Sequence, residues 1–288
     1  MIWVTGSKGM LGSDLIKSLE KSGQEVIASD IEVDITNRSQ IFSFVEDKAI
    51  KAIVNCSAYT AVDNAEDERE KAFCVNEKGP GNLAGIARLL SIPLLHISTD
   101  YVFDGTQVNG LTEDMKTKPI GVYGQSKLAG EIKVRQTTEH HFIIRTSWLY
   151  GKHGTNFVST MIKLMNERDR VGVVSDQWGS PTWTRDLSQF ITHIITHRSE
   201  QWGIYHFSNE GRTSWYEFAC SIYELGKKYG HIQNSCHIVP ISTKEFPTRA
   251  KRPVNSFLTK HKAKQVFQIE IPEWQISLNK FLRNYQEF

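Results

Sequence analysis

The sequence predicts an α/β fold: a Rossmann-type doubly wound parallel sheet with a smaller C-terminal α/β part. Two observations carry this prediction. Short apolar segments of strand length alternate with segments of helical periodicity through the first half of the chain, and strands that alternate with helices form parallel sheets. The first strand segment also runs directly into a Gly-x-x-Gly-x-x-Gly loop and then a helix, which is the order found in dinucleotide-binding units.

The composition of the 288 residues is that of an ordinary globular enzyme. Hydrophobic residues make up 40% and charged residues 23%, and the net charge of +2 is too small to indicate a nucleic-acid or membrane-surface protein. The four cysteines have neither disulfide nor zinc spacing, so we expect them to be reduced. Neither a membrane-spanning apolar run nor a leader pattern is visible. We therefore expect a cytoplasmic protein.

The glycine loop predicts a pyrophosphate site. Residues 2–5 form the strand, and Gly6, Gly9 and Gly12 space the loop that leads into the helix. Glycines let backbone N–H groups approach an anion at the positive end of the helix. The next strand ends on Asp30, whose carboxylate is placed to accept hydrogen bonds from the adenosine ribose hydroxyls.

Further strand and helix segments follow up to position 97. We interpret the acidic stretch from Asp63 to Glu70 as a solvated helix start. In chain order we expect a helix at 41–45 capped by Thr36 or Asn37, a strand at 52–55, a loop of small residues at 56–60, a helix from about 72 to 90 and a strand at 93–97. The loop at 56–60 should lie at the carboxyl end of the sheet, where ligands bind in open α/β folds.

Two segments carry residues suited to acid–base chemistry. Ser98 and Thr99 follow a strand, and a hydroxyl at that position can donate a hydrogen bond to a substrate oxygen. Tyr123 and Lys127 lie four residues apart in a helix, hence on one face. An ammonium group beside a phenol should lower the pKa of the phenol, so Tyr123 can give a proton to a developing alkoxide or take it back. A strand at 142–146 follows this helix.

Beyond residue 150 we expect a substrate-binding part. Residues 1–150 should form the dinucleotide-binding core and residues 151–288 mainly the substrate-binding part, interleaved with the core. Its expected elements are a helix at 156–167, a strand at 171–174, a helix capped by Thr184, a strand at 203–207, a helix capped by Ser214 and a final helix near 272–286. Trp148 leaves the sheet at the expected cleft. His193 and His197 have metal-ligand spacing but no third ligand, so no metal site is predicted.

Together, the glycine loop, Ser98-Thr99-Asp100 and the pair Tyr123 and Lys127 resemble the extended short-chain dehydrogenase/reductase superfamily. Four longer segments make the resemblance closer. The segments 98–105, 145–151, 176–182 and 252–256, which read STDYVFDG, RTSWLYG, DQWGSPT and RPVNS, are similar to the dTDP-4-dehydrorhamnose reductase family. This resemblance spans nearly the whole chain.

The resemblance implies reduction of the 4-keto group of dTDP-4-dehydro-L-rhamnose with NADPH or NADH, in nucleotide-sugar synthesis. It implies that Thr99 binds the keto oxygen, that Tyr123 protonates it, and that Lys127 binds the nicotinamide ribose. Asp100, Trp148 and Arg252 would contact the substrate, Arg252 at its diphosphate. The residues implied for cofactor binding are Gly6, Gly9, Met10, Leu11, Gly12, Asp30, Asp34, Ile35, Ala58, Tyr59, Thr60, Tyr123 and Lys127.

Several alternatives stay open at this stage. Asp30 favours NADH, whereas Lys8 or Arg38 could accommodate the 2′-phosphate of NADPH. The chain could instead be a non-catalytic NAD(P)-binding subunit, as in the regulatory subunit of methionine adenosyltransferase, or a reductase or epimerase of another nucleotide sugar. The expected partner is a small nucleotide sugar. We expect no nucleic-acid or membrane partner, and the oligomer considered is a homodimer.

Overall fold

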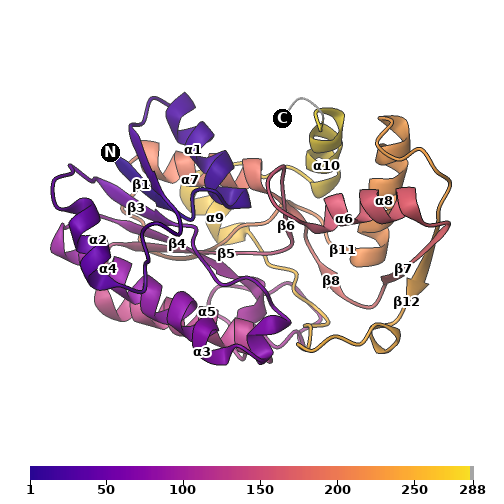
Figure 1. Cartoon of the computed structure of the whole chain (residues 1–288), viewed down its shortest axis with the longest axis horizontal. Coiled ribbons are helices and arrows are strands. Elements are labelled where there is room, and N and C mark those ends of the chain that lie inside the picture. The colour runs from indigo at the N-terminus through magenta and orange to yellow at the C-terminus, as the bar shows by residue number, and fades with distance from the viewer. Residues whose placement is uncertain (286–288) are drawn as a thin grey trace.

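The computed structural model describes residues 1–285. Its main sheet has six strands, and Figure 1 shows this sheet on one side with a smaller part beside it. The strands follow the order β10-β5-β4-β3-β1-β2, and every pair in this sheet is parallel. They span β1 Ile2–Thr5, β2 Val26–Ser29, β3 Ala52–Asn55, β4 Leu94–Thr99, β5 His141–Thr146 and β10 Gly203–His206. The doubly wound parallel sheet is confirmed.

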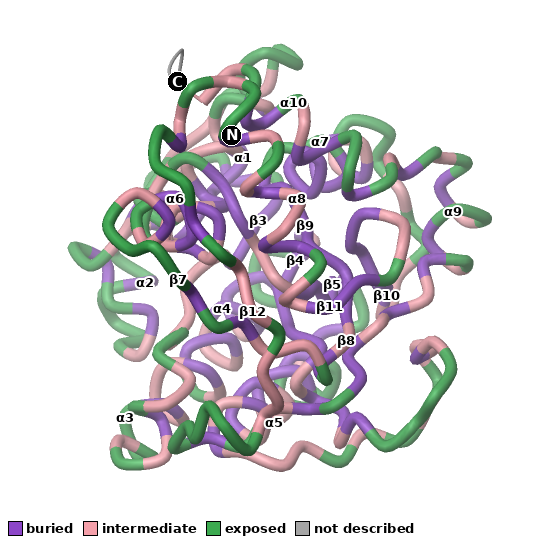
Figure 2. Tube along the Cα trace, turned by 90° about the vertical axis from the view of Figure 1, so that its right-hand side faces the viewer, coloured by how far each residue is buried: buried purple, intermediate pink, exposed green. Residues whose placement is uncertain are grey.

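Helices cover both faces of this sheet, as in Figure 1. One face packs α1 (Met10–Lys21), α7 (Thr184–Thr196) and α9 (His261–Phe267). The other packs α2 (Arg38–Val45), α4 (Gly79–Leu89) and α5 (Val122–Thr137). Buried apolar side chains on both faces of a strand are typical of parallel sheets. Figure 2 accordingly shows buried segments gathered in the central strands and exposed ones on the outer turns.

The smaller part has its own apolar core, built by three helices and a two-stranded parallel sheet. These are α6 (Phe157–Glu167), α8 (Trp215–Lys228), α10 (Trp274–Arg283), β7 (Arg170–Val174) and β12 (His237–Ile241). Two short pairs lie between the parts: β6 (Leu149–Tyr150) with β9 (Thr182–Trp183), and β8 (Trp178–Gly179) with β11 (Thr213–Ser214). Ser214 caps α8 in a capping box with Glu217.

The predicted helix at 72–90 is not a regular α-helix. It consists of α3 (Arg69–Phe73), a π-helical turn (Cys74–Lys78) and α4. Pro80 has no N–H to donate to the carbonyl of Asn76 four residues earlier, so the α-helical pattern fails there. The π-helical turn carries Asn76, whose side chain accepts a hydrogen bond from the Tyr59 N–H at 2.8 Å and donates one to the Tyr59 carbonyl at 3.0 Å. A π turn thus holds the loop that follows β3.

Two other predicted boundaries were wrong. Thr184 does not cap its helix but is the first helical residue, and Trp183 precedes it. The Thr184 hydroxyl instead donates to the Asp14 carboxylate at 2.5 Å, which ties α7 to α1. The final helix is Trp274–Arg283, and position 286 of the predicted range lies outside the described residues. Asn37, one of the two predicted caps, does cap α2.

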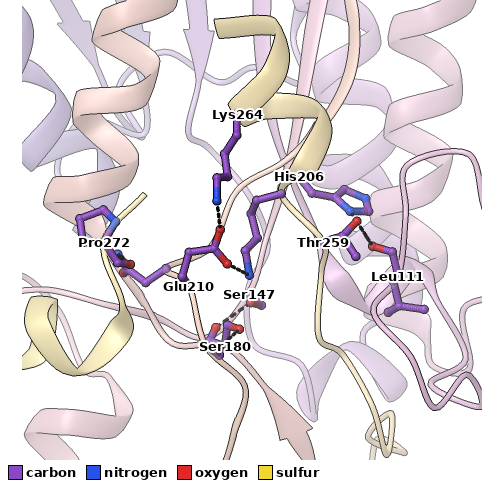
Figure 3. Close-up of polar contacts among 11 residues, drawn as sticks. Leu111, Ser147, Ser180, His206, Glu210, Thr259, Lys264 and Pro272 are labelled. Carbon is purple, nitrogen blue, oxygen red and sulfur yellow. Dashed lines mark hydrogen bonds and ion pairs between the residues drawn. The ribbon is translucent and has the colours of Figure 1, made fainter. Parts of the chain in front are cut away.

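A buried ion pair joins the sheet part to the C-terminal segment. The Lys260 ammonium lies 3.2 Å from one Glu210 oxygen, and Lys264 lies 3.0 Å from the other. Figure 3 shows Glu210 and Lys264 facing each other, with Ser147 and Ser180 nearby. Lys260 is 1% exposed. Burial raises the pKa of Glu210, but the two lysines outweigh burial and hold it below its usual range.

We expect Glu210→Gln to lower the free energy of unfolding by about 2–3 kcal/mol. Removing one partner leaves the Lys260 charge buried and uncompensated, which costs about 3–5 kcal/mol for a fully buried pair, and Glu210 is partly exposed. Because the folded-state pKa of Glu210 is depressed, its contribution is present above the ordinary glutamate pKa and is lost as the pH falls through the lowered value. Denaturant unfolding at pH 7 measures the loss. The exposed Glu270→Gln should show none, and equal stabilities for the two variants would contradict the prediction.

Candidate active site

A cleft of about 1130 Å³ opens at the carboxyl ends of β1, β3, β4 and β5. This edge of the sheet is where open α/β folds bind ligands. Most of the residues predicted for the site line it: Gly6, Gly9, Met10, Leu11, Gly12, Asp30, Asp34, Ile35, Ala58, Thr60, Thr99, Asp100, Tyr123, Lys127 and Trp148. Tyr59 and Arg252 are not among its lining residues.

The glycine loop lines one end of the cleft, directly before the N-terminus of α1. Gly6 has a positive φ of 64°, and a Cβ atom there would lie 2.7 Å from the backbone nitrogen of Ser57. A Cβ atom at Gly12 would lie 2.2 Å from the Gly6 carbonyl oxygen. The residue before α1, Gly9, has no side chain to cap the helix, and the first turn has no acidic residue. The first N–H groups of α1 therefore remain available to an anion, so the loop fits the pyrophosphate of a dinucleotide.

Asp30 lines the cleft beside the glycine loop. Its carboxylate accepts hydrogen bonds from the backbone nitrogens of Lys8, at 2.8 Å, and Ile31, at 3.0 Å. These bonds fix the carboxylate beside the glycine loop. The Lys8 ammonium lies 3.5 Å from the carboxylate of Glu32. The Lys8 ammonium, one of the two charges expected to accommodate a 2′-phosphate, is therefore paired with an acid.

Thr99 and Tyr123 meet at the centre of the cleft. Thr99 ends β4, and its hydroxyl donates to Asp100 at 2.9 Å and accepts from the Tyr101 N–H at 3.2 Å. Tyr123 lies in the first turn of α5, and its ring packs edge-on against Tyr101 at 5.7 Å between centroids. The side chain is partly exposed to the cleft, but burial among protein atoms raises the pKa of Tyr123 to about 12, although the Thr99 hydroxyl opposes the rise.

Lys127 lies one turn further along α5 and is 2% exposed. Its ammonium donates to the Ile97 carbonyl at 2.6 Å. Burial lowers the pKa of Lys127 to about 8. The expectation that Lys127 depresses the pKa of Tyr123 is wrong for this structure: the phenol pKa is raised, because burial dominates and the ammonium is directed to β4.

Asp100 lies beneath the same centre and is 3% exposed. Burial raises the pKa of Asp100 to about 7, while hydrogen bonds from Ser256 and Thr99 oppose the rise. Its Oδ2 atom has no hydrogen-bond partner among the described residues. A carboxyl group that titrates near neutral pH can accept or donate a hydrogen bond toward a sugar hydroxyl.

Two tryptophans form one wall of the cleft. Trp148 has a left-handed backbone, with φ of 47°, and its ring stacks on Trp215 with centroids 3.5 Å apart and planes 9° apart. A Cβ atom at Gly179 would lie 2.6 Å from the Trp148 ring. Sequence analysis missed Trp215. The sequence indicated that Trp215 follows the Ser214 cap. It gave no sign that the start of α8 lies against Trp148.

A model of one protein family, the RmlD substrate binding domain, matches residues 1–287. The chain belongs to this family. The dTDP-4-dehydrorhamnose reductase of Aggregatibacter actinomycetemcomitans, a similar protein, is 41% identical over 290 residues, which cover 99% of this chain and 98% of that protein. The corresponding reductase of Escherichia coli is 35% identical over 98% of this chain and 96% of that protein.

A solved structure of a dTDP-4-dehydrorhamnose reductase from Bacillus anthracis in complex with NADP matches with a TM-score of 0.91 and 40% identity, over 97% of each chain. The recognition from sequence is thus confirmed at the level of the family. The described part of the chain, residues 1–285, holds no helix that is both long and apolar enough to cross a membrane.

Two residues that the resemblance to this family implied for the site are not among the lining residues of the cleft. Tyr59 has its backbone held by Asn76, and its hydroxyl donates to Glu68 at 3.2 Å, so the side chain is directed toward α3. Arg252 donates to Asp63 at 2.6 Å, outside the cleft lining. Asp63 is therefore a salt-bridge partner of Arg252, although sequence analysis read it as part of a solvated helix start.

Within residues 1–285 no group of three or more metal-ligating side chains exists. His193 and His197 stack with ring centroids 3.9 Å apart near the end of α7. The Nδ1 atom of His197 lies 2.9 Å from the His193 carbonyl oxygen, so one ring nitrogen of the pair is already used by the backbone.

Proposed function

We propose that this protein reduces the 4-keto group of dTDP-4-dehydro-L-rhamnose to the hydroxyl of dTDP-L-rhamnose, using NADH or NADPH. The observation that carries the proposal is the meeting of Thr99, Tyr123 and Lys127 in one cleft with the glycine loop. Membership in a family whose curated relatives are named for this reaction supports the substrate. The reaction belongs to the synthesis of a nucleotide-sugar precursor for polysaccharides.

The dinucleotide supplies the hydride when bound, and the chain's residues manage the charge that develops on the keto oxygen. The Tyr123 hydroxyl donates a hydrogen bond to that oxygen, and the Thr99 hydroxyl, which donates to Asp100 in the free protein, turns its hydrogen toward the oxygen when the substrate binds. The pKa of Tyr123, about 12, keeps the phenol protonated at neutral pH, so it holds a proton to give to the alkoxide as general acid. Lys127 holds the nicotinamide ribose, and Asp100 and Trp148 contact the sugar.

We also propose the division of labour between the two parts. Residues 1–150 bind the dinucleotide, and residues 151–288 mainly bind the substrate. Thr155 and Trp215 support this division, because both come from the later part and line the same cleft. Strand β10 lies in the central sheet although it follows residue 150, which supports an interleaved arrangement. We further propose that Arg252 binds the diphosphate of the substrate at the edge of the cleft. Burial raises the pKa of Tyr101, and the charge of Arg252 opposes that rise, which supports a position of Arg252 close to this cleft residue.

We expect NADH to be the better cofactor, and Asp30→Asn to shift the preference toward NADPH. Asp30 presents a carboxylate at the ribose, and Glu32 pairs with Lys8, so a 2′-phosphate would meet two acids. A charge-assisted hydrogen bond contributes about 1.5–3 kcal/mol, so the ratio of the two kcat/KM values should change roughly 10-fold or more. Initial rates with both cofactors measure it. The exposed Asp47→Asn should leave the ratio unchanged; an unchanged ratio in Asp30→Asn would count against the assignment.

The proposed function is tested by nicotinamide absorbance with purified protein and dTDP-4-dehydro-L-rhamnose made in situ. Oxidation of NADH or NADPH that depends on the sugar, with dTDP-L-rhamnose as the product, is the expected result. A protein that binds dinucleotide but oxidises neither cofactor would overturn the proposal. It would favour the regulatory-subunit alternative, for which a co-purifying partner enzyme is the signature.

One relative favours a second substrate. A dTDP-4-keto-6-deoxy-D-glucose reductase of Streptomyces niveus is 42% identical over 224 residues, which cover 77% of this chain and 77% of that protein. Its substrate also carries a keto group at C4 of a dTDP-sugar. Parallel assays with the two keto sugars, the second prepared without the epimerase, decide between them, since the faster kcat/KM identifies the substrate.

A further inference from the structure

We infer that Glu131 is a positioning residue for Lys127: its carboxylate anchors α5 to β4 one helical turn beyond the lysine, and its charge acts on the lysine ammonium at the base of the cleft. The inference rests on the proposed function, in which Lys127 binds the cofactor ribose. Glu131 is 1% exposed and lies outside the cleft lining, so it does not contact a ligand in the cleft itself.

The spacing along α5 puts the three groups in one line. Tyr123, Lys127 and Glu131 are separated by four residues each, so they lie on one face of the helix, which packs on β4. Two neighbouring residues of β4 receive two of these side chains. Lys127 donates to the Ile97 carbonyl at 2.6 Å, and Glu131 accepts from the Ser98 hydroxyl at 2.5 Å. The Glu131 contact therefore fixes the helix next to the carbonyl that orients Lys127.

Arg145 fixes the carboxylate from the neighbouring strand. Its guanidinium donates to both oxygens of Glu131, from Nε at 2.9 Å and from the terminal nitrogen at 2.7 Å. Arg145 on β5 is paired in register with Ser98 on β4. A bidentate guanidinium contact restricts the orientation of a carboxylate. Glu131 is thus held by two strands, through Ser98 of β4 and Arg145 of β5.

Glu131 is also the carboxylate that acts on the charge of Lys127. Burial lowers the pKa of Lys127, and the charge of Glu131 opposes this most strongly, with Cys56 contributing less. The other titratable groups around Lys127 are neutral at pH 7. Burial raises the pKa of both the Cys56 thiol and the Tyr123 phenol to about 12, and burial together with Lys127 holds the pKa of His96 on β4 well below its usual range. Arg145 on β5 is the remaining charge, and it is paired with Glu131.

Glu131→Gln should therefore lower the pKa of Lys127, by roughly one unit, because the charge of Glu131 opposes the effect of burial on the ammonium. The titration is followed by NMR of lysines labelled with ¹³C at Cε, with Lys127→Arg to assign the signal. Glu131→Asp keeps the charge and should titrate close to the wild type. An unchanged Lys127 midpoint in Glu131→Gln, in folded protein, would overturn the inference.

The pH profile of kcat/KM provides a second readout. A merely structural role of Glu131 would not shift this profile along the pH axis. The alkaline limb of the kcat/KM profile should shift to lower pH in Glu131→Gln by the same amount as the NMR midpoint, and should stay in place in Glu131→Asp. A loss of activity equal at every pH would contradict a role through the charge of Lys127.

One complication needs its own variant, since Glu131→Gln leaves Arg145 buried without its carboxylate. The double variant Glu131→Gln/Arg145→Gln removes both charges of the pair, and its Lys127 midpoint should also fall; a midpoint that stays in place would overturn the inference. The proposed function can fail separately. Wild-type protein that oxidises neither cofactor with the sugar would overturn that function, while the lysine titration would still test the inference.

Discussion

The Tyr123→Phe variant should turn over about 10²–10⁴-fold more slowly than the wild type, which is the range typical for removal of a general acid. The phenol lies at the cleft centre and holds its proton at neutral pH, since burial raises its pKa to about 12. The substitution removes one oxygen and keeps the ring that packs edge-on against Tyr101. The loss should appear in kcat, measured by nicotinamide absorbance at saturating substrate.

Two measurements separate this loss from damage to the site. The dissociation constant for NADH, measured by quenching of tryptophan fluorescence, should change little, because the glycine loop and Asp30 are untouched. The control is Tyr101→Phe, which removes the hydroxyl of the neighbouring tyrosine in the same cleft and should cost less than about 10-fold, because that oxygen has no assigned role in proton transfer. If Tyr123→Phe keeps more than a tenth of the turnover, Tyr123 is not the general acid.

Thr99→Val should lower kcat by about 10²–10³, the cost of losing one hydrogen-bond donor to a developing oxyanion. Valine keeps the shape of threonine and removes the hydroxyl. That hydroxyl also accepts from the Tyr101 N–H, so a loss of about 1 kcal/mol of stability should accompany the loss of rate. Thr99→Ser retains the hydroxyl and should retain most of the activity.

The chain offers a matched control for this variant. Thr146 ends β5, is paired in register with Thr99, and lines the same cleft. Its hydroxyl lies 3.5 Å from that of Thr182. Thr146→Val should therefore change kcat by less than about 10-fold, because no oxyanion role is assigned to that hydroxyl. Equal losses in Thr99→Val and Thr146→Val would show that the cleft is sensitive to any change at the strand ends.

The sequence alone determined those features that depend on neighbours along the chain. The glycine loop, the acid at the end of β2, the hydroxyl at the end of β4 and the spacing of Tyr123 from Lys127 follow from local rules for strands, turns and helices. A parallel sheet then brings the carboxyl ends of its strands to one edge, which is why these separate motifs line one cleft. The prediction of the fold came from these rules, whereas the family and many of the predicted cleft residues came from the resemblance of longer segments to a known family.

Only the tertiary structure decided how distant segments meet. Trp215 stacks on Trp148, Arg252 pairs with Asp63, and Arg145 pairs with Glu131. None of these pairs has a signal in residue spacing, because each depends on how two packed elements are placed. The pKa of Tyr123 shows the same limit. Spacing indicated a neighbouring positive charge and thus a lowered pKa, but burial, which depends on everything packed around the phenol, raises it.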